Sequence, residues 1–174
     1  MIALWLHLLT LAVVAPHPGP GDAPLAQFVR IEIHGEGRTL KKEATDKDGN
    51  ITPAVMEGRI LSLAEVEVFS DKKNVALNGT ATQSTTYQKF GAQLAIDGVL
   101  DGAHASGSVT HTNTTAEDGS PPLLAWWEVD LGAPLSIDQV TIWNRTDSAQ
   151  SRLAGYALIL LDKNRQEVGR IPPH

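Results

Sequence analysis

Two arginines and an aspartate close together in the sequence are the residues best suited to bind a polar ligand. Arg145, Asp147 and Arg152 follow a strand-like run, Val140–Asn144, which predicts a loop at the end of a sheet. Each guanidinium offers five N–H donors in a rigid fork, and a carboxylate can fix that fork by charge-assisted hydrogen bonds. Such a loop could hold a neutral polyol with neighbouring hydroxyls. A surface Arg–Asp–Arg pairing without a ligand is the alternative.

The elements that position this loop are predicted to be strands. Short segments of alternating apolar and polar residues recur along the chain, and turn dipeptides such as Asn78-Gly79 and Asp97-Gly98 separate them. No segment has a long helical period, so we predict an all-β fold, a jelly-roll β-sandwich. Strand position favours the core over ligand stacking for both Trp126 and Trp127. The predicted strands are Phe28–Ile33, Leu61–Phe69, Leu123–Leu131, Ile137–Trp143 and Tyr156–Leu161, with a turn at Leu131–Pro134.

Composition limits the domain count and the kinds of partner. The 174 residues, 42% of them hydrophobic, suffice for one domain with a core. A net charge of -6 without a long basic block argues against nucleic acid or an anionic membrane as a partner. The absence of cysteine excludes disulfides and thiolate metal sites. No Gly-x-Ser-x-Gly or His-Glu-x-x-His motif is present, so we predict that the protein is not an enzyme.

An apolar stretch at the start of the chain, Ile2–Ala15, is broken by the Pro- and Gly-rich segment Pro16–Ala23. It is shorter than the roughly 20 residues that span a bilayer, and it fits the apolar region of a secretory signal peptide. We therefore expect residues 1–24 to be a signal peptide and linker, with no membrane span and a secreted or cell-envelope location. An ordinary N-terminal helix is the alternative. Residues 25–174 are predicted to form one domain with an insertion at residues 41–58.

The arginine loop resembles the motif of the F-type lectins, the fucose-binding fucolectin family among the discoidin-like, galactose-binding-like jelly-roll domains. That motif is a His followed by Arg-x-Asp-x4-Arg, and residues 145–152 fit its second part residue for residue. Asn74–Ser84 resembles the family's opening strand. Ala95–Gly98, followed by Gly107–His111, resembles the loop that precedes the family's histidine.

The order of the strands differs from that of the family. Phe28–Ile33 and Leu61–Phe69 resemble the family's closing strands, yet they precede the opening strand here. The chain therefore resembles a circular permutation of the domain, or a slice through tandem copies. In both cases we expect these two strands to pair in the same jelly roll as Asn74–Leu77 and Tyr156–Leu161.

The resemblance implies a sugar site whose donors are His111, Arg145 and Arg152. The imidazole should stay neutral beside two arginines, because like charges disfavour protonation, and it could then offer one donor and one acceptor. Family members place aromatic residues against the 6-methyl group of fucose, whereas His104 and Ala105 occupy the matching positions here. The implied carbohydrate-binding residues are His111, Arg145, Asp147, Arg152, Tyr87 and His104.

The resemblance also implies a structural calcium ion. Carboxylates, a hydroxyl and carbonyl oxygens suit this hard cation, which takes six to eight oxygen ligands. A plain turn at Asp97-Gly98 and an exposed strand position for Glu65 are the alternatives. The implied ligands are the side chains of Asp97, Ser108 and Glu65, with the backbone oxygens of Leu94, Val99 and Ala64.

Two functions follow from the resemblance. The first is a calcium-stabilised lectin module that binds fucosylated or related glycans, with avidity from a homo-oligomer or a tandem-domain arrangement. The second is a discoidin-like protein-binding or adhesion module that has kept the scaffold and lost the sugar. The complete polar triad favours the first function, and the altered methyl-facing positions favour the second.

Overall fold

The computed structural model describes residues 25–34, 44–45, 47–49, 51–52, 59–113, 124–147 and 149–172. The predicted signal peptide and linker, residues 1–24, lie outside these ranges, as does part of the insertion at 41–58. The boundaries of the predicted domain therefore stay a prediction. No helix in the described ranges has the length and apolarity needed to cross a bilayer.

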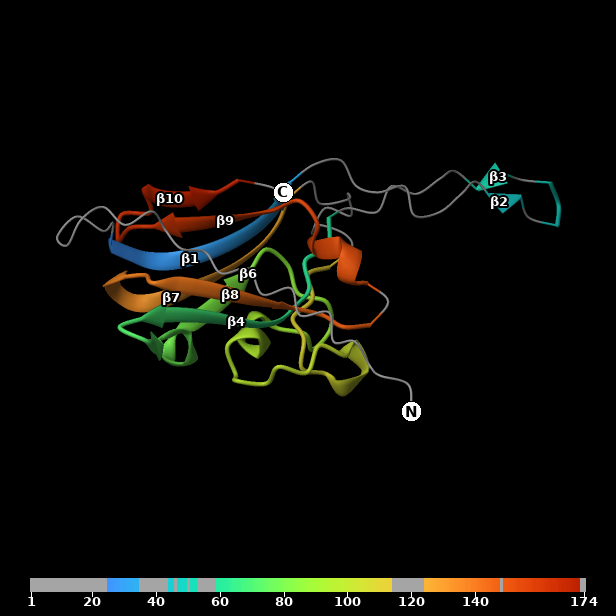
Figure 1. The fold of residues 1–174 in the computed structure, drawn as a ribbon. Helices are drawn as coiled ribbons and strands as arrows, with labels where there is room; N and C mark the ends of the chain where they lie inside the picture. Colours follow the sequence, from blue (N-terminus) through green and yellow to red (C-terminus); the bar gives the residue numbers. More distant parts are fainter. Residues whose placement is uncertain are drawn as a thin grey trace.

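The described chain folds into two antiparallel sheets that face each other (Figure 1). The larger sheet has the strand order β10-β9-β1-β7-β6, and the smaller sheet has the order β5-β4-β8. The larger sheet contains β1 (Leu25–His34), β6 (Thr80–Gln83), β7 (Leu124–Ser136), β9 (Tyr156–Leu161) and β10 (Glu167–Ile171). The smaller contains β4 (Leu63–Ser70), β5 (Lys73–Asn74) and β8 (Gln139–Asn144). The predicted all-β jelly-roll sandwich is confirmed.

Short elements complete the fold. Four 3-10 helices lie in the described loops: η1 (Ala76–Asn78), η2 (Ala92–Ala95), η3 (His104–Ser106) and η4 (Gln150–Leu153). Within the predicted insertion, β2 (Ala44–Thr45) and β3 (Ile51–Thr52) pair with each other and with neither sheet.

The N-terminal strands are part of the sandwich. Strand β1 lies between β7 and β9, with Ile31 opposite both Trp127 and Leu158. Strand β4 pairs with β5 through Phe69 and Asn74, and with β8 on its other side. The prediction that these strands share one jelly roll with the C-terminal strands is confirmed. The choice between a permutation and a slice of tandem copies stays a prediction.

The core lies between the two sheets and contains Trp127. Its side chain is fully buried and its indole N–H donates to the carbonyl of Ala92 at 2.9 Å. Trp126, by contrast, is half-buried, and the Arg30 guanidinium lies 4.2 Å from its ring centre. The core prediction is therefore confirmed for Trp127 and wrong for Trp126, because successive residues of a strand point to opposite faces of the sheet.

The predicted turn at Leu131–Pro134 does not end a strand. Strand β7 continues to Ser136, and its register with β1 shifts between Ala26 and Phe28. Gly132 has φ 80°, a left-handed conformation that suits glycine. The turn-forming residues thus make an irregularity inside a paired strand, which is how a β-bulge absorbs extra residues.

Candidate functional site

His111 is held on an extended segment that runs beside the start of β4. The N–H groups of Thr110 and Thr112 donate to the carbonyls of Leu63 and Leu61 at 2.8 and 2.9 Å. The hydroxyls of the same two threonines accept from the N–H groups of Leu63 and Leu61 at 3.0 and 2.9 Å. His111 is 6% exposed. Four hydrogen bonds therefore fix the backbone on both sides of a buried imidazole.

Arg145 is the first residue after β8 and is also buried. Its Nε and Nη2 donate to the two carboxylate oxygens of Asp147, each at 2.6 Å. This bidentate contact is the main cause that lowers the pKa of Asp147 to about 2. The structure thus places Asp147 as the residue that orients the fork. No hydrogen bond joins Nη1 of Arg145 to any of the described residues, so this nitrogen can serve a ligand.

Arg152, on η4, reaches the imidazole of His111. Its Nη1 lies 3.2 Å from Nε2 of His111, while Nδ1 of His111 lies 2.7 Å from the carbonyl of Thr112. A carbonyl only accepts, so Nδ1 carries the proton and Nε2 is the acceptor. Burial, followed by the charges of Arg152 and Arg145, lowers the pKa of His111 to about 4. The imidazole is therefore neutral at pH 7, as expected, and it presents an acceptor because the backbone uses its donor.

Two loops are locked together at this site. The N–H of His104 donates to Asp147 at 3.1 Å, and the N–H of Thr146 donates to the carbonyl of Gly102 at 2.9 Å. A Cβ at Gly102 would lie 2.8 Å from the Asn144 carbonyl oxygen and from the Thr146 nitrogen. Only glycine fits there, so the loop that carries His104 packs directly against the loop that carries Arg145.

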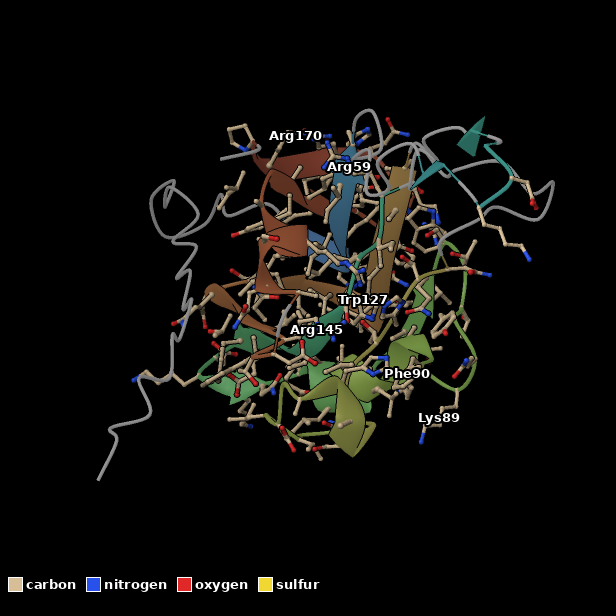
Figure 2. All side chains as sticks on the ribbon, turned by 90° about the vertical axis from the view of Figure 1, so that its right-hand side faces the viewer. Arg59, Lys89, Phe90, Trp127, Arg145 and Arg170 are labelled. Carbon is tan, nitrogen blue, oxygen red and sulfur yellow. The ribbon has the colours of Figure 1, made fainter. Side chains whose placement is uncertain are left out.

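An aromatic cluster lies beside the polar groups. The ring of Phe90 stacks on His104 with centroids 4.3 Å apart, and Tyr87 lies 5.1 Å from His111. The rings of His104 and His111 are 5.6 Å apart. Figure 2 views this end of the sandwich, with Arg145 and Phe90 both in view. Phe90 was not among the predicted site residues, although its position three residues after Tyr87 was a usable signal.

The structure brings together several of the predicted carbohydrate-binding residues. Arg145 contacts Asp147, Asp147 contacts His104, and the ring of His104 lies beside that of His111. Arg152 and Tyr87 complete the group through His111. At the predicted methyl-facing position, the ring of His104 stacks on the buried ring of Phe90.

The predicted calcium ligands are gathered only in part. Oε1 of Glu65 accepts from the N–H of Gly98 at 3.0 Å, which places this carboxylate next to Asp97. Leu94 and Ala64 belong to one apolar cluster. Val99 donates its N–H to Asp97 at 2.9 Å, whereas the Ser108 hydroxyl donates to the carbonyl of Asp101. The contacts of the described residues therefore do not join Ser108 to Asp97.

Glu65 is a buried carboxylate on β4. It is 1% exposed, which rules out the exposed strand position, and its Oε2 has no hydrogen-bond partner among the residues that the structure describes. Burial, with a further contribution from the charge of Asp97, raises the pKa of Glu65 to about 7. No group of three or more His, Asp or Glu side chains suited to a metal occurs in the described ranges. The predicted set needs only two carboxylates with a hydroxyl and carbonyls, and of these Glu65 and Asp97 lie together, whereas the Ser108 hydroxyl is bound to the Asp101 carbonyl. The calcium ion therefore stays a prediction.

Known proteins match the part of the chain that forms this site. Residues 94–170 match the family model described as a NedA-like, galactose-binding domain. Fucolectin-1 of Anguilla japonica is 37% identical over 94 residues, which cover 51% of this chain and 49% of that protein. Fucolectin-6 of the same species is 42% identical over 98 residues, which cover 53% and 48%. Fucolectin of Anguilla anguilla is 37% identical over 89 residues, which cover 48% and 52%.

These matches confirm the resemblance that the sequence motifs indicate. The chain spans about half the length of the curated relatives it matches. No solved structure matches the chain at a comparable level.

Proposed function

We propose that this chain, which resembles the F-type lectins and the galactose-binding-like domains, is a carbohydrate-binding lectin module for terminal fucose or a related sugar. The observation that carries the proposal is the buried Arg145 fork, which Asp147 fixes bidentately within reach of the loop that carries His104. The similarity to fucolectins supports the same conclusion.

The polar groups match the chemistry of a sugar. Neighbouring hydroxyls both donate and accept, and the site offers them guanidinium donors from Arg145 and Arg152 and an imidazole acceptor from His111. A sugar hydroxyl could donate to Nε2 of His111 where Arg152 now does. A pre-oriented fork loses little rotamer freedom on binding, which favours affinity.

The apolar face of the sugar would meet the aromatic cluster. Tyr87 is half-buried and lies beside His111, and His104 is held against Phe90. A sugar with a methyl group or an apolar ring face is therefore preferred to one that is polar on every side. Such a small ligand binds weakly at a single site, with an expected Kd in the millimolar to micromolar range, about 4–8 kcal/mol.

The alternative is a discoidin-like protein-binding or adhesion module that has lost sugar binding. The observation that supports it is that His104 and Ala105 stand at the methyl-facing positions, where members of the family have aromatic residues. The stacking of His104 on Phe90 weakens this argument, because the half-buried imidazole is itself an aromatic ring held in a fixed position.

A structural calcium ion is part of the proposal. Glu65 and Asp97 would supply carboxylate oxygens, and the backbone oxygens of Leu94, Val99 and Ala64 would complete the site with Ser108. The unpartnered Oε2 of Glu65 supports it. When bound, the ion would supply charge neutralisation for two carboxylates and would tie the loop after η2 to β4.

The biological setting follows from this function. We propose that the partners are fucosylated or related glycans, that the module is non-enzymatic, and that it acts in a secreted or cell-envelope location. A weak single site also calls for several copies, in a homo-oligomer or a tandem-domain arrangement, to give useful avidity.

A glycan array with folded wild-type protein and the Arg145→Lys variant tests the proposal. The wild type should bind glycans that carry terminal fucose or a related sugar. The variant keeps the charge but lacks the planar fork, so its signal should fall to background. Binding to none of the glycans by folded wild type would favour the adhesion module.

A further inference from the structure

We propose that this site selects acidic glycans, in which a sulfate ester or a carboxylate next to the bound sugar contacts the ammonium group of Lys89. The inference rests on the proposed lectin function and specifies its ligand class. Lys89 occupies a turn, Tyr87–Phe90, whose aromatic residues border the sugar site.

The turn that carries Lys89 is fixed relative to His111. The N–H of Tyr87 donates to the His111 carbonyl at 2.9 Å, and the N–H of His111 donates to the Phe90 carbonyl at 3.0 Å. The turn closes on itself through a bond from the Phe90 N–H to the Tyr87 carbonyl at 3.1 Å. Gln88, at its tip, has φ 52°, a left-handed value that few residues other than glycine adopt. A tightly held turn with this backbone places the next residue, Lys89, at a defined position.

The Lys89 side chain lies beside Phe90 and Gly107. Its Nζ lies 5.8 Å from the ring centre of Phe90, and the His111 ring lies 6.3 Å from the same centre. A Cβ at Gly107 would lie only 3.3 Å from Nζ, so the missing side chain of Gly107 leaves the space along which Lys89 lies. Figure 2 shows Lys89 next to Phe90, at the outer edge of the molecule.

No acidic residue in the described ranges neutralises this ammonium. Asp147, the acid of the arginine loop, pairs with Arg145. Asp101, the acid of the loop before His104, accepts hydrogen bonds from the Ala103 N–H and from Ser106. Lys89 is exposed and forms no ion pair with any residue that the structure describes. Among the described residues, the Lys89 ammonium beside Phe90 is therefore available to an anionic group on a bound glycan.

A preference for acidic glycans would have to come from Lys89 itself, because the protein as a whole is negatively charged. A net charge of -6 repels polyanions, so a general electrostatic attraction cannot produce a preference for acidic glycans. An exposed ion pair in water adds little to the binding free energy, so acidic glycans should bind about two- to fivefold more tightly than their neutral counterparts. Because both charges are exposed, the preference should weaken as salt is added.

Calorimetric titration with a sulfated fucose oligosaccharide and its desulfated counterpart tests the inference. Wild type should bind the sulfated form about two- to fivefold more tightly at low salt. Lys89→Gln should remove this preference and leave the affinity for the desulfated form unchanged, while Lys89→Arg should keep it. Lys163→Gln is the matched control, because this exposed lysine follows β9 at the opposite end of the sandwich. A fucosylated oligosaccharide with and without a sialic acid forms the carboxylate arm.

The outcomes separate the two proposals. If wild type binds both oligosaccharides equally, or if Lys89→Gln and Lys163→Gln behave alike, the acidic preference is refuted and the lectin function stands. If folded wild type binds neither oligosaccharide, the lectin function fails and the inference fails with it. A preference present in only one arm supports the inference and identifies whether the anion is a sulfate or a carboxylate.

Discussion

Replacing Asp147 by asparagine should both destabilise the fold and abolish sugar binding. The amide keeps the size of the side chain but puts an NH₂ group against the Arg145 fork, where the carboxylate now accepts two bonds of 2.6 Å. A bond to a charged group contributes about 1.5–3 kcal/mol. Breaking a fully buried pair costs about 3–5 kcal/mol. The lower range applies, because the Asp147 side chain is 32% exposed and water screens the pair.

The assay is thermal unfolding of wild type and Asp147→Asn across pH. A loss of about 1.5–3 kcal/mol lowers the Tm by about 3–12 °C in a domain of this size. The Arg145 contact lowers the pKa of Asp147 from its usual value of 3.8 to about 2. A lowered pKa means that its stabilising contribution is complete above pH 3.8 and is lost as the pH falls through about 2.

The difference in unfolding free energy between the two proteins should therefore be constant from about pH 5 to pH 7 and shrink toward pH 2. The depressed pKa of His111 destabilises both proteins alike as the pH falls from 6.5 to about 4, so it cancels in the comparison. Equal melting temperatures at pH 7, or a difference that grows in acid, would refute the role assigned to Asp147.

Three further variants test other parts of the account. Gly102→Ala should lose sugar binding and lower the Tm, because its Cβ would lie 2.8 Å from backbone atoms. Gly91→Ala, whose Cβ would have no atom within 4 Å, should match wild type. Equal behaviour of the two variants would contradict the close packing of the two loops. Trp127→Ala should cost about 3–5 kcal/mol by denaturant unfolding, and Trp126→Ala, on the outer face, should cost clearly less. Calcium should raise the Tm of wild type and not that of Asp97→Ala, and a Tm unmoved by calcium or chelator would count against the ion.

The strands and the main polar contact follow from local patterns in the sequence. Alternation of apolar and polar residues identifies β1 and β4, since a half-buried strand needs one apolar face. The spacing of Arg145 and Asp147 allows a carboxylate to meet the fork, and the structure has that contact. Both features depend on residues close in the sequence, whose possible relative positions are restricted by the backbone.

The resemblance also predicted that β1 and β4 pair in one sandwich with β9 and β5 and that His111 lies near Arg152, but other contacts were not predicted. The outward position of Trp126 depends on the pairing of β7 with β1, and adjacent tryptophans do not reveal which of them faces the core. The Phe90–His104 stack joins two loops that meet only in the folded chain. The tautomer of His111 depends on a contact with the carbonyl of the next residue, Thr112, and the sequence does not reveal in which direction the imidazole points.

The most direct test of the lectin function is a calorimetric titration of fucose into wild type and Arg152→Ala, both shown to be folded. Arg152 is half-buried and donates to the imidazole of His111, so the Tm of the variant is measured first to show that it is folded. A hydroxyl left unpaired costs about 1–3 kcal/mol, which takes a weak interaction below detection. The account predicts saturable binding by wild type, with a Kd in the millimolar to micromolar range, and no measurable heat for the variant. Absence of binding by folded wild type, or equal binding by both proteins, would contradict it.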